Sequence, residues 1–298
     1  MNKILVVGSL NMDLVTKVQK TPLIGETISG VGLDLIPGGK GANQAVALGK
    51  LKASVEMIGV IGDDDNGRHL KANLDQMHVK SDHLKTVENV PTGVALIMVN
   101  ASGDNSIVVI PGANSELKPS DVNASWFKDV SLVICQLEIP VETVETVLKM
   151  AQGLGIKTVL NPAPAKALSN ELLSTVDLLI PNETEFESLT GIAVKTKEDF
   201  IKGYEKLHQL GIREVIVTLG AKGAWYYDGD HFVAVNAKKV KAVDTTAAGD
   251  SFIAGVCDSI ARGLSIKKAL EMGTEVAAIT VTRFGAQSSL PSREEIER

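Results

Sequence analysis

Residues 132–160, LVICQLEIPVETVETVLKMAQGLGIKTVL, contain the pattern that decides the fold class. The stretch opens with a short apolar run, Leu132–Gln136, continues with the helix-period segment Val141–Leu154, and ends with a second short run, Thr158–Leu160. Short apolar runs predict buried strands, and apolar residues that recur every three or four positions predict an amphipathic helix. A strand, a helix and a second strand in this order predict a parallel pair with a right-handed crossover.

The same alternation continues over most of the chain. The other strand-like runs are Ile4–Val7, Val55–Ile61, Leu178–Ile180 and Val215–Leu219. The other helix-period segments are Asn66–Met77, Lys197–Leu210, Ala247–Arg262 and Ile266–Phe284. We therefore predict an α/β fold, in which a doubly wound, mostly parallel central sheet is flanked by helices and residues 1–298 form a single domain.

Two segments interrupt this alternation. Residues 12–36 read as extended and are punctuated by Pro22 and Gly25. Within residues 92–110, two β-rich runs are joined by the turn-forming residues 101–104, which predicts a hairpin. We predict that the two segments form a small β-sheet that covers the carboxyl edge of the central sheet as a lid. The alternative is an ordinary surface hairpin.

Composition excludes several classes of partner. The net charge of the 298-residue chain is −6, so its surface offers no general attraction to nucleic acid or to an anionic membrane. The apolar run that ends at Gly8 is too short for a signal peptide or a membrane span. The two cysteines, Cys135 and Cys257, lie in apolar stretches and are typical of buried thiols in a reducing compartment. We predict a cytoplasmic protein with neither nucleic-acid nor membrane partners.

The segment Val243–Phe252 is the most informative about chemistry. It is interpreted as the end of a strand that leads into a helix, with the small residues Ala247, Ala248 and Gly249 at the helix start. Free N–H groups at a helix N-terminus form a natural anion site. Asp250 then lies in the first helical turn. There it either complements the helix dipole or acts as a base beside a bound phosphate, and these residues alone leave both roles open.

Further polar or glycine-rich segments follow other predicted strands. Asn11 and Asp13 alternate onto one side of an extended chain, where an amide and a carboxylate suit a polyhydroxylated ligand, although both residues are also common in turns. Pro37–Ala45 is glycine-rich and opens a helix. Pro181–Glu185 and Thr218–Gly223 also follow strands, and Asn182 has the alternative role of helix N-cap. The P-loop and dinucleotide-binding patterns are both absent from the sequence.

Taken in order, these segments resemble the ribokinase-like family of carbohydrate kinases over essentially the whole chain. The matching blocks are Gly8–Asp13, Gly38–Ala45, Asn161–Ala165, Pro181–Glu185 and Asp244–Asp250. The resemblance implies transfer of the γ-phosphoryl group of ATP to the primary hydroxyl of a small sugar. Asn11 favours ribose, because a polar side chain there can satisfy an extra ring hydroxyl. Deoxyribose, other pentoses, hexoses and nucleosides remain alternatives.

The resemblance also implies roles for individual residues. Asp250 is expected to be the general base, and Ala247, Ala248 and Gly249 to form the anion hole, although the family often has glycine at the position of Ala247. The expected sugar contacts are Asn11, Asp13, Gly39, Lys40, Asn43, Glu138 and Asp250. The expected ATP contacts are Asn182, Thr218, Gly220, Gly223, Gly249 and Thr274.

The resemblance further implies two cations and a second subunit. Glu185 is expected to hold Mg²⁺ through water. The expected K⁺ ligands, several through backbone carbonyls, are Asp244, Thr246, Thr280, Arg283, Gly285 and Ser289. A homodimer that pairs through the lid is expected. Two competing functions are a non-catalytic sugar sensor, disfavoured by the complete set of site residues, and a dinucleotide-dependent oxidoreductase, disfavoured by the missing glycine fingerprint.

Overall fold

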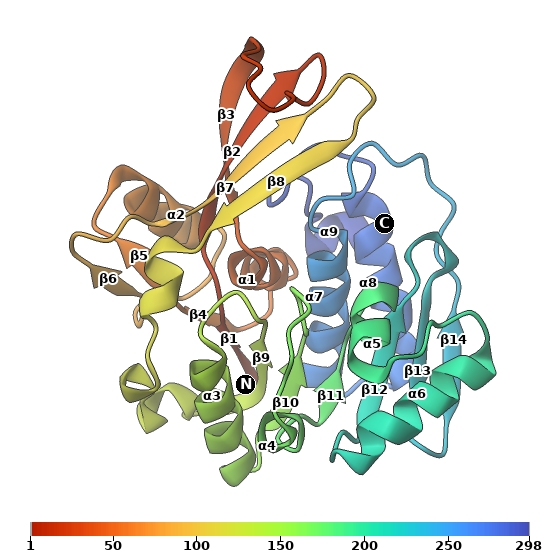
Figure 1. Ribbon diagram of the computed structural model, residues 1–298. Helices are drawn as coiled ribbons and strands as arrows, with labels where there is room; N and C mark the ends of the chain where they lie inside the picture. Colours follow the sequence, from red (N-terminus) through yellow and green to blue (C-terminus); the bar gives the residue numbers. More distant parts are fainter. Residues whose placement is uncertain (1, 298) are drawn as a thin grey trace.

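The central sheet of the computed structural model, which describes residues 2–297, has eight strands in the order β14-β13-β12-β11-β10-β9-β1-β4 (Figure 1). All pairs from β12 to β4 are parallel, and the two pairs at the β14 edge are antiparallel. The mostly parallel sheet is thus confirmed. Its strands are β1 (Lys3–Val7), β4 (Val55–Ile58), β9 (Val130–Cys135), β10 (Lys157–Leu160), β11 (Leu178–Leu179), β12 (Glu214–Thr218), β13 (Ala224–Tyr227) and β14 (Phe232–Val235).

Helices cover both faces of this sheet. Within β1, Ile4 and Val6 belong to one hydrophobic core, and the alternate residues Leu5 and Val7 belong to another. A strand that is apolar on both faces is typical of a parallel sheet with helices on each side. The first core includes residues of α1 (Lys40–Lys50), α2 (Asp65–Gln76), α7 (Ala248–Ala261) and α8 (Ile266–Thr280). The second includes residues of α3 (Val141–Gly153), α4 (Asn170–Leu173), α5 (Glu183–Thr190) and α6 (Lys197–Gln209).

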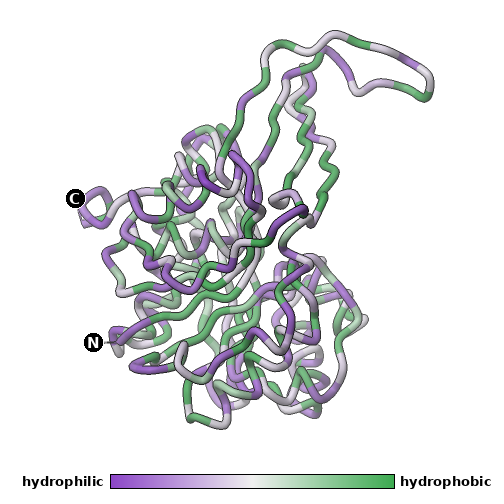
Figure 2. Tube along the Cα trace, turned by 90° about the vertical axis from the view of Figure 1, so that its left-hand side faces the viewer, coloured by the Kyte–Doolittle hydropathy of each residue, from purple (hydrophilic) through white to green (hydrophobic). Residues whose placement is uncertain are grey.

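A second, four-stranded sheet projects from the body in Figures 1 and 2. Its strand order is β3-β2-β7-β8, and the predicted hairpin is confirmed as β7 and β8. Because β2 begins at Asn11, directly after β1 ends at Val7, the small sheet starts at the carboxyl edge of the central sheet. Its strands are β2 (Asn11–Val18), β3 (Gly30–Gly38), β7 (Gly93–Val99) and β8 (Asn105–Ile110).

The remaining elements are short. The strands β5 (Val60–Gly62) and β6 (Lys85–Val87) form a parallel pair, and α9 (Arg293–Ile296) lies near the C-terminus. Single 3₁₀ turns lie at Gly112–Glu116, Pro119–Asp121, Ala124–Phe127 and Gly220–Lys222. Across residues 2–297, no helix has both the length and the apolar character needed to cross a bilayer. Cys135 and Cys257 are buried free thiols, as the apolar surroundings predicted.

Two strand predictions were incomplete. The antiparallel pair β13 and β14, which extends the sheet beyond β12, was not predicted. The run Val55–Ile61 was predicted as one strand but divides at Gly59 into β4 and β5. A Cβ atom on Gly59 would lie 2.4 Å from a methyl carbon of Leu10, so glycine permits the close approach at which the chain leaves the central sheet.

Two predictions near the C-terminus were wrong. Val243 was interpreted as the end of a strand, but residues 236–247, between β14 and α7, contain no strand. The helix-period segment Ile266–Phe284 ends four residues early as a helix, at Thr280. The carbonyl of Val281 accepts the N–H groups of Val243 and Asp244 at 2.7 and 3.3 Å, so it is used to hold this loop.

Candidate active site

Asp250 lies in the first turn of α7, and its carboxylate is held by two amides of α1. Its Oδ2 accepts from Asn43 Nδ2 at 3.0 Å, and its Oδ1 accepts from Gln44 Nε2 at 2.9 Å. Burial raises the pKa of Asp250; Lys40 and the two amides act in the opposite direction, and Glu138 raises the pKa further. A buried carboxylate of raised pKa in a cavity has the properties of a general base.

The start of α7 forms a tight turn beside this carboxylate. Ala247 is in the left-handed region, with φ of 59°. The N–H of Ala248 donates to the carbonyl of Thr245 at 3.2 Å, whereas the amides of Ala247 and Gly249 have no acceptor among residues 2–297. The prediction of three free amides is therefore wrong for Ala248, because the turn at 245–248 uses its N–H. Two free donors remain at a helix N-terminus, where an anion is stabilised.

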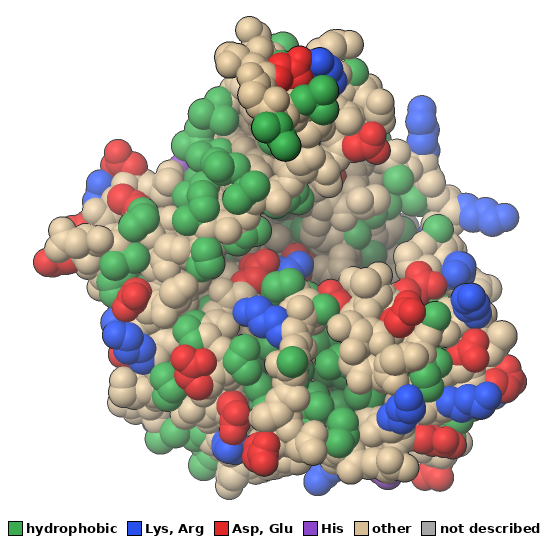
Figure 3. All heavy atoms as spheres, in the orientation of Figure 1, with side chains coloured by type: hydrophobic (Ala, Val, Ile, Leu, Met, Phe, Trp, Pro, Cys, Tyr) green, Lys and Arg blue, Asp and Glu red, His purple; other side chains and the backbone are tan. Residues whose placement is uncertain are grey.

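Two cavities meet at this helix start. The inner cavity, of about 230 Å³, is lined by Lys40, Glu185 and Asp250 among others. The outer cavity, of about 470 Å³, is lined mostly by small and apolar side chains and includes Gly220, Gly223 and Thr274. Both are lined by Thr218, Thr245, Ala248 and Gly249. The helix N-terminus thus lies between a charged pocket and a larger apolar pocket. Figure 3 shows a hollow below the small sheet with charged side chains at its floor.

Asn11 and Asp13 are brought to this region by β2, and both are buried. Asn114, in a 3₁₀ turn, donates from Nδ2 to Asn11 Oδ1 at 2.8 Å and to the carbonyl of Leu10 at 3.0 Å. The Asn11 amide is therefore oriented with its oxygen occupied, and its Nδ2, which has no acceptor among residues 2–297, can donate to a ligand. Burial, Glu138 and Asp250 together raise the pKa of Asp13 to about 7.

Glu138 and Lys40 lie between these groups. Glu138 Oε2 accepts from Ser9 Oγ at 2.6 Å and from the N–H of Lys40, the first residue of α1, at 3.2 Å. A carboxylate at a helix N-terminus is favoured by the helix dipole. Burial alone would lower the pKa of Lys40, but the carboxylates of Asp250, Glu138 and Glu185 together raise it. Lys40 is thus held positively charged among acids.

Glycine is required next to Lys40. Gly39 has a φ of +88°, and a Cβ atom there would lie 2.7 Å from the backbone nitrogen of Asn11. The glycine therefore allows the start of α1 to pack directly against the start of β2. This contact brings Lys40 and Asn43 to the same site as Asn11.

Asn182 and Glu185 form a capping box at the start of α5. Asn182 Oδ1 accepts from the N–H of Glu185 at 2.8 Å, and Glu185 Oε2 accepts from the N–H of Asn182 at 2.9 Å. The N-cap role considered for Asn182 is confirmed. Both residues also line the inner cavity, and burial raises the pKa of Glu185. Capping and ligand contact are compatible, because one oxygen and one nitrogen remain outside the capping bonds.

Asp244 connects the two segments that were expected to hold K⁺. Its Oδ1 accepts from the N–H and hydroxyl of Thr246 at 2.9 and 2.7 Å, and its Oδ2 accepts from the N–H of Gly285 at 2.9 Å. Burial opposes ionisation of Asp244, but these hydrogen bonds lower its pKa overall. The Arg283 guanidinium pairs with Glu295 at 2.5 Å, so its side chain is engaged elsewhere. Thr280 and Ser289 are buried in the same segment.

Sequence reasoning missed several side chains that hold the site together. Gln44 contacts Asp250, Asn114 contacts Asn11, and Ser9 contacts Glu138. Gln44 stands between Asn43 and Ala45 in a helix whose next residues are Ala45, Val46 and Ala47. A polar residue within such an apolar helix is expected to have a buried partner, and this signal could have identified it.

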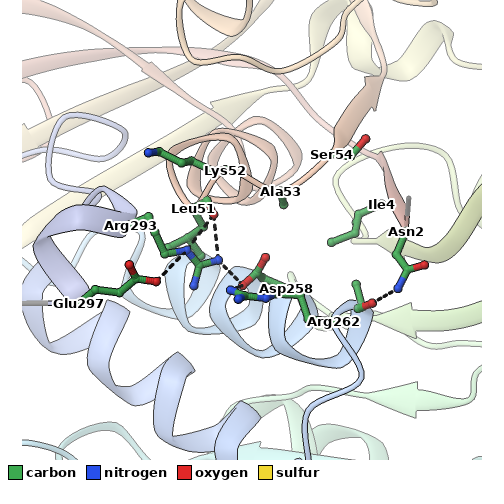
Figure 4. Close-up of a pocket in the computed structure, with 11 residues that line it drawn as sticks. Asn2, Ile4, Leu51, Lys52, Ala53, Ser54, Asp258, Arg262, Arg293 and Glu297 are labelled. Carbon is green, nitrogen blue, oxygen red and sulfur yellow. Dashed lines mark hydrogen bonds and ion pairs between the residues drawn. The ribbon is translucent and has the colours of Figure 1, made fainter.

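Another cavity, also of about 470 Å³, lies at the opposite, amino edge of the sheet (Figure 4). Its charged side chains pair with one another: Arg293 contacts Asp258 at 2.5 Å and donates to the carbonyl of Leu51 at 2.8 and 3.0 Å. These bonds connect α9 to the ends of α1 and α7. We therefore interpret this cavity as part of the packing of the C-terminal helix.

Comparisons with known proteins agree with this geometry. The sequence model described as "pfkB family carbohydrate kinase" matches residues 1–293. A ribokinase of Haemophilus influenzae is 42% identical over 292 residues, which cover 97% of this chain and 95% of that protein. A deoxyribokinase of Salmonella typhimurium is 38% identical over 295 residues, which cover 98% of this chain and 96% of that protein.

A solved structure shares the fold over almost the whole chain. The Arabidopsis thaliana ribokinase complexed with ribose and ATP matches with a TM-score of 0.93 and 32% sequence identity, covering 99% of this chain and 97% of that one. The similarity in sequence and in fold extends over both sheets and the site between them. The chain belongs to the pfkB family of carbohydrate kinases.

Proposed function

We propose that the protein phosphorylates the primary hydroxyl of D-ribose, forming ribose 5-phosphate by direct in-line transfer from ATP. The observation that carries this proposal is the position of Asp250. Its buried carboxylate lies at a helix start with two free amides, where a charged pocket meets a larger apolar pocket. The similarity to ribokinases, one of them solved with ribose and ATP, supports ribose as the acceptor.

The geometry suggests how the side chains divide the work. Asp250 keeps lone pairs that are not used by Asn43 or Gln44, and one of them accepts the proton of the attacking hydroxyl. The amides of Ala247 and Gly249, with Lys40, stabilise the negative charge of the transferred group. Asn11, Asp13 and the neighbouring Glu138 bind the sugar hydroxyls. Closure of the small sheet as a lid would exclude water and so limit hydrolysis of ATP.

Mg²⁺ is proposed to bind together with the nucleotide. Within the described chain, no group of three or more acidic, histidine or cysteine side chains could hold a metal by itself. Mg²⁺ in kinases is held mainly by phosphates, water and one or two carboxylates, so the proposal requires no such group. Glu185, with its buried carboxylate on the inner cavity, would hold the ion through water. When bound, the ion neutralises charge on the phosphates.

K⁺ is proposed to bind between residues 244–246 and 280–289. The ionised Asp244 already joins these segments, and the carbonyl groups of both suit a hard monovalent ion. An ion there would fix the loop that leads into the turn of Ala247. Removal of K⁺ is therefore expected to lower kcat.

A homodimer is proposed to form through the outer face of the small sheet. Leu14 pairs with Leu35 and with Leu96, and Leu96 pairs with Val108, so these side chains share one face. The neighbouring positions in register, Asp13 and Ala95, face the active site instead. The exposed apolar residues of the outer face are Leu33, Leu35, Leu96, Val108 and Ile110. An apolar patch of this kind is typical of a protein–protein contact.

The alternative acceptor is 2-deoxyribose, because a deoxyribokinase is among the similar proteins. The free Asn11 Nδ2 favours ribose, since a donor left without the extra hydroxyl is unpaired. Asn11→Met is therefore expected to lower kcat/KM for ribose by about 100-fold and for deoxyribose by much less.

The experiment is an ATP-consumption assay with ribose, 2-deoxyribose, fructose and adenosine, each with and without K⁺, and identification of the product by ³¹P NMR. Ribose is expected to have the highest kcat/KM and to yield the 5-phosphate. A higher kcat/KM for another acceptor would replace ribose in the proposal. No acceptor-dependent consumption of ATP would contradict the kinase activity itself.

A further inference from the structure

The Asp250 carboxylate is held by two consecutive side chains of α1. Asn43 donates to one oxygen at 3.0 Å, and Gln44 donates to the other at 2.9 Å. Gln44 is fully buried and Asn43 nearly so. Because the donors come from one helix turn and act on both oxygens, they fix the rotation of the carboxylate as well as its position.

Each of these amides is itself held at its oxygen. Gln136 Nε2 donates to Gln44 Oε1 at 2.7 Å, and Gln287 Nε2 donates to Asn43 Oδ1 at 3.2 Å. Asn73 in turn donates to Gln287 Oε1 at 2.6 Å. A reversed Gln44 amide would place its oxygen against Asp250 and its nitrogen against the Gln136 donor. With Asp250 ionised, these donors and acceptors fix the Gln44 amide in one orientation; Gln136 Oε1 has no hydrogen-bond partner among residues 2–297, so Gln136 is held through its nitrogen alone.

Gly8, in the first of the matching sequence blocks, leaves space for the Gln136 side chain. A Cβ atom on Gly8 would lie 2.0 Å from Gln136 Oε1. Gln136 is also completely buried and directly follows β9. The room beside Gly8 thus lets Gln136 reach Gln44.

All members of this chain are uncharged. The charged groups that face Asp250 come from other positions: Lys40 from α1, Asp13 from β2, Glu185 from α5 and Glu138 from the segment after β9. A cationic donor in place of Gln44 would stabilise the carboxylate strongly and weaken it as a base. Amide donors orient the carboxylate with a much smaller loss of basicity.

We propose that Gln44 is a positioning residue that, held by Gln136, fixes the Asp250 carboxylate in the orientation required to accept the proton of the sugar hydroxyl. This inference rests on the proposed role of Asp250 as the base. Gln44 itself contacts Asp250, Asn161 and Gln136, and it acts on the reaction through Asp250.

The test compares Gln44→Leu with a control variant, Asn114→Leu. The control also removes a buried amide, but one that contacts Asn11. Gln44→Leu is expected to lower kcat by about 10- to 100-fold with little change in the KM for sugar. The acid limb of the pH profile of kcat/KM is expected to move to higher pH by about one unit, because a donor to the charged form is lost. Asn114→Leu is expected to raise the KM and to leave the acid limb in place.

A carbon-13 titration of the Asp250 carboxyl gives a readout that does not require activity. The titration midpoint is expected to rise in Gln44→Leu and more strongly in Gln44→Glu, where a second carboxyl group faces Asp250. Should Gln44→Leu fail to fold, Gln136→Leu tests the same chain one step away, with a smaller shift in the same direction.

Two results would overturn the inference. One is a wild-type pH profile and kcat in Gln44→Leu. The other is a fall in kcat without any shift of the Asp250 titration, which would mean a merely structural role. Failure of the wild-type protein to phosphorylate any sugar would instead contradict the proposed function, and the titration would still decide whether Gln44 acts on Asp250.

Discussion

Asp13 is buried on β2 near two other carboxylates, Glu138 and Asp250, and accepts no hydrogen bond from residues 2–297. A carboxylate in this position is costly for the folded protein, which is why its pKa is raised to about 7. The group is nevertheless suited to accept hydroxyl donors from a sugar. The buried position of Asp13 thus destabilises the folded protein, and binding of the proposed ligand would relieve this destabilisation.

This position predicts a pH-dependent gain of stability in Asp13→Asn. Between the ordinary pKa of 3.8 and about 7, the folded protein holds a proton on Asp13 that the unfolded chain has lost. The free energy of unfolding of the wild type therefore falls as pH rises through this range. Asp13→Asn has no carboxyl group at this position, so its free energy of unfolding does not fall in this way. The variant should therefore be only slightly more stable than the wild type near pH 4, and more stable by at most about 4 kcal/mol above pH 7.

Urea unfolding at several pH values measures this difference, with Asp34→Asn on the exposed part of β3 as the matched control. Sugar binding to Asp13→Asn should be lost at the same time. A constant stability difference from pH 4 to pH 8 would contradict the account of Asp13.

At the residue scale, the sequence identified most of the side chains that the structure brings together. Asn11, Asp13 and Asp250 could be found because each follows a strand or begins a helix in a recognisable block. The roles of Gln44, Gln136 and Asn114 could not be assigned, because they depend on partners from 92 to 206 positions away along the chain. The packing of α1 against α7 brings Gln44 to Asp250, and the 3₁₀ turn at Gly112–Glu116 brings Asn114 to Asn11.

At the element scale, the start of α7 combines a left-handed residue with a glycine that has no close neighbours. A Cβ atom on Gly249 would meet nothing within 4 Å, and Gly249 lines both cavities. A methyl group there would therefore enter the space proposed for the phosphate rather than disturb the fold. The backbone conformation at Gly249 does not require glycine, and we propose that the residue serves ligand approach instead.

Gly249→Ala is expected to fold normally, with a free energy of unfolding equal to or up to about 1 kcal/mol above that of the wild type. Its kcat should fall at least tenfold, because the anion site is obstructed. Gly153→Ala is the matched control: this glycine is also helical and also has open space at its Cβ position, but it lies at the end of α3. Unfolding and ATP-consumption assays measure both effects. Wild-type kcat in Gly249→Ala would contradict the placement of the phosphate.

The sequence predicts helices and strands well where the spacing of apolar residues determines the type of element. The helices α3 and α6 begin and end within one residue of their predicted bounds. The antiparallel strands β13 and β14 were not predicted, because both are short and their partners lie across a turn at the sheet edge. The end of α8 was placed too late, since the apolar period continues beyond Thr280 into a loop that binds residues 243 and 244.

At the scale of the whole molecule, the small sheet presents one face to the active site and an apolar face to solvent. Leu33 and Val108 are each more than half exposed on that outer face. Burial of these side chains against a second subunit would gain free energy in proportion to the apolar area covered. The proposed dimer would therefore also steady the strand that carries Asn11 and Asp13.

The variant Leu33→Lys/Val108→Lys is expected to be monomeric at concentrations where the wild type is dimeric, as measured by sedimentation. Its KM for sugar should rise, because β2 loses support. Leu154→Lys, which charges an equally exposed leucine at the end of α3, is the matched control and should remain dimeric. A monomeric wild-type protein, or a dimer unaffected by the double substitution, would contradict this interface.

The central claim is that Asp250 accepts the proton of the attacking sugar hydroxyl. The most direct test is ribose-dependent ATP consumption by the wild type and by Asp250→Asn, alongside calorimetric binding of ribose and of ATP to both. The account predicts that kcat falls by about 10²–10⁴-fold, while both dissociation constants change little. A variant that keeps more than about a tenth of the wild-type kcat would contradict it.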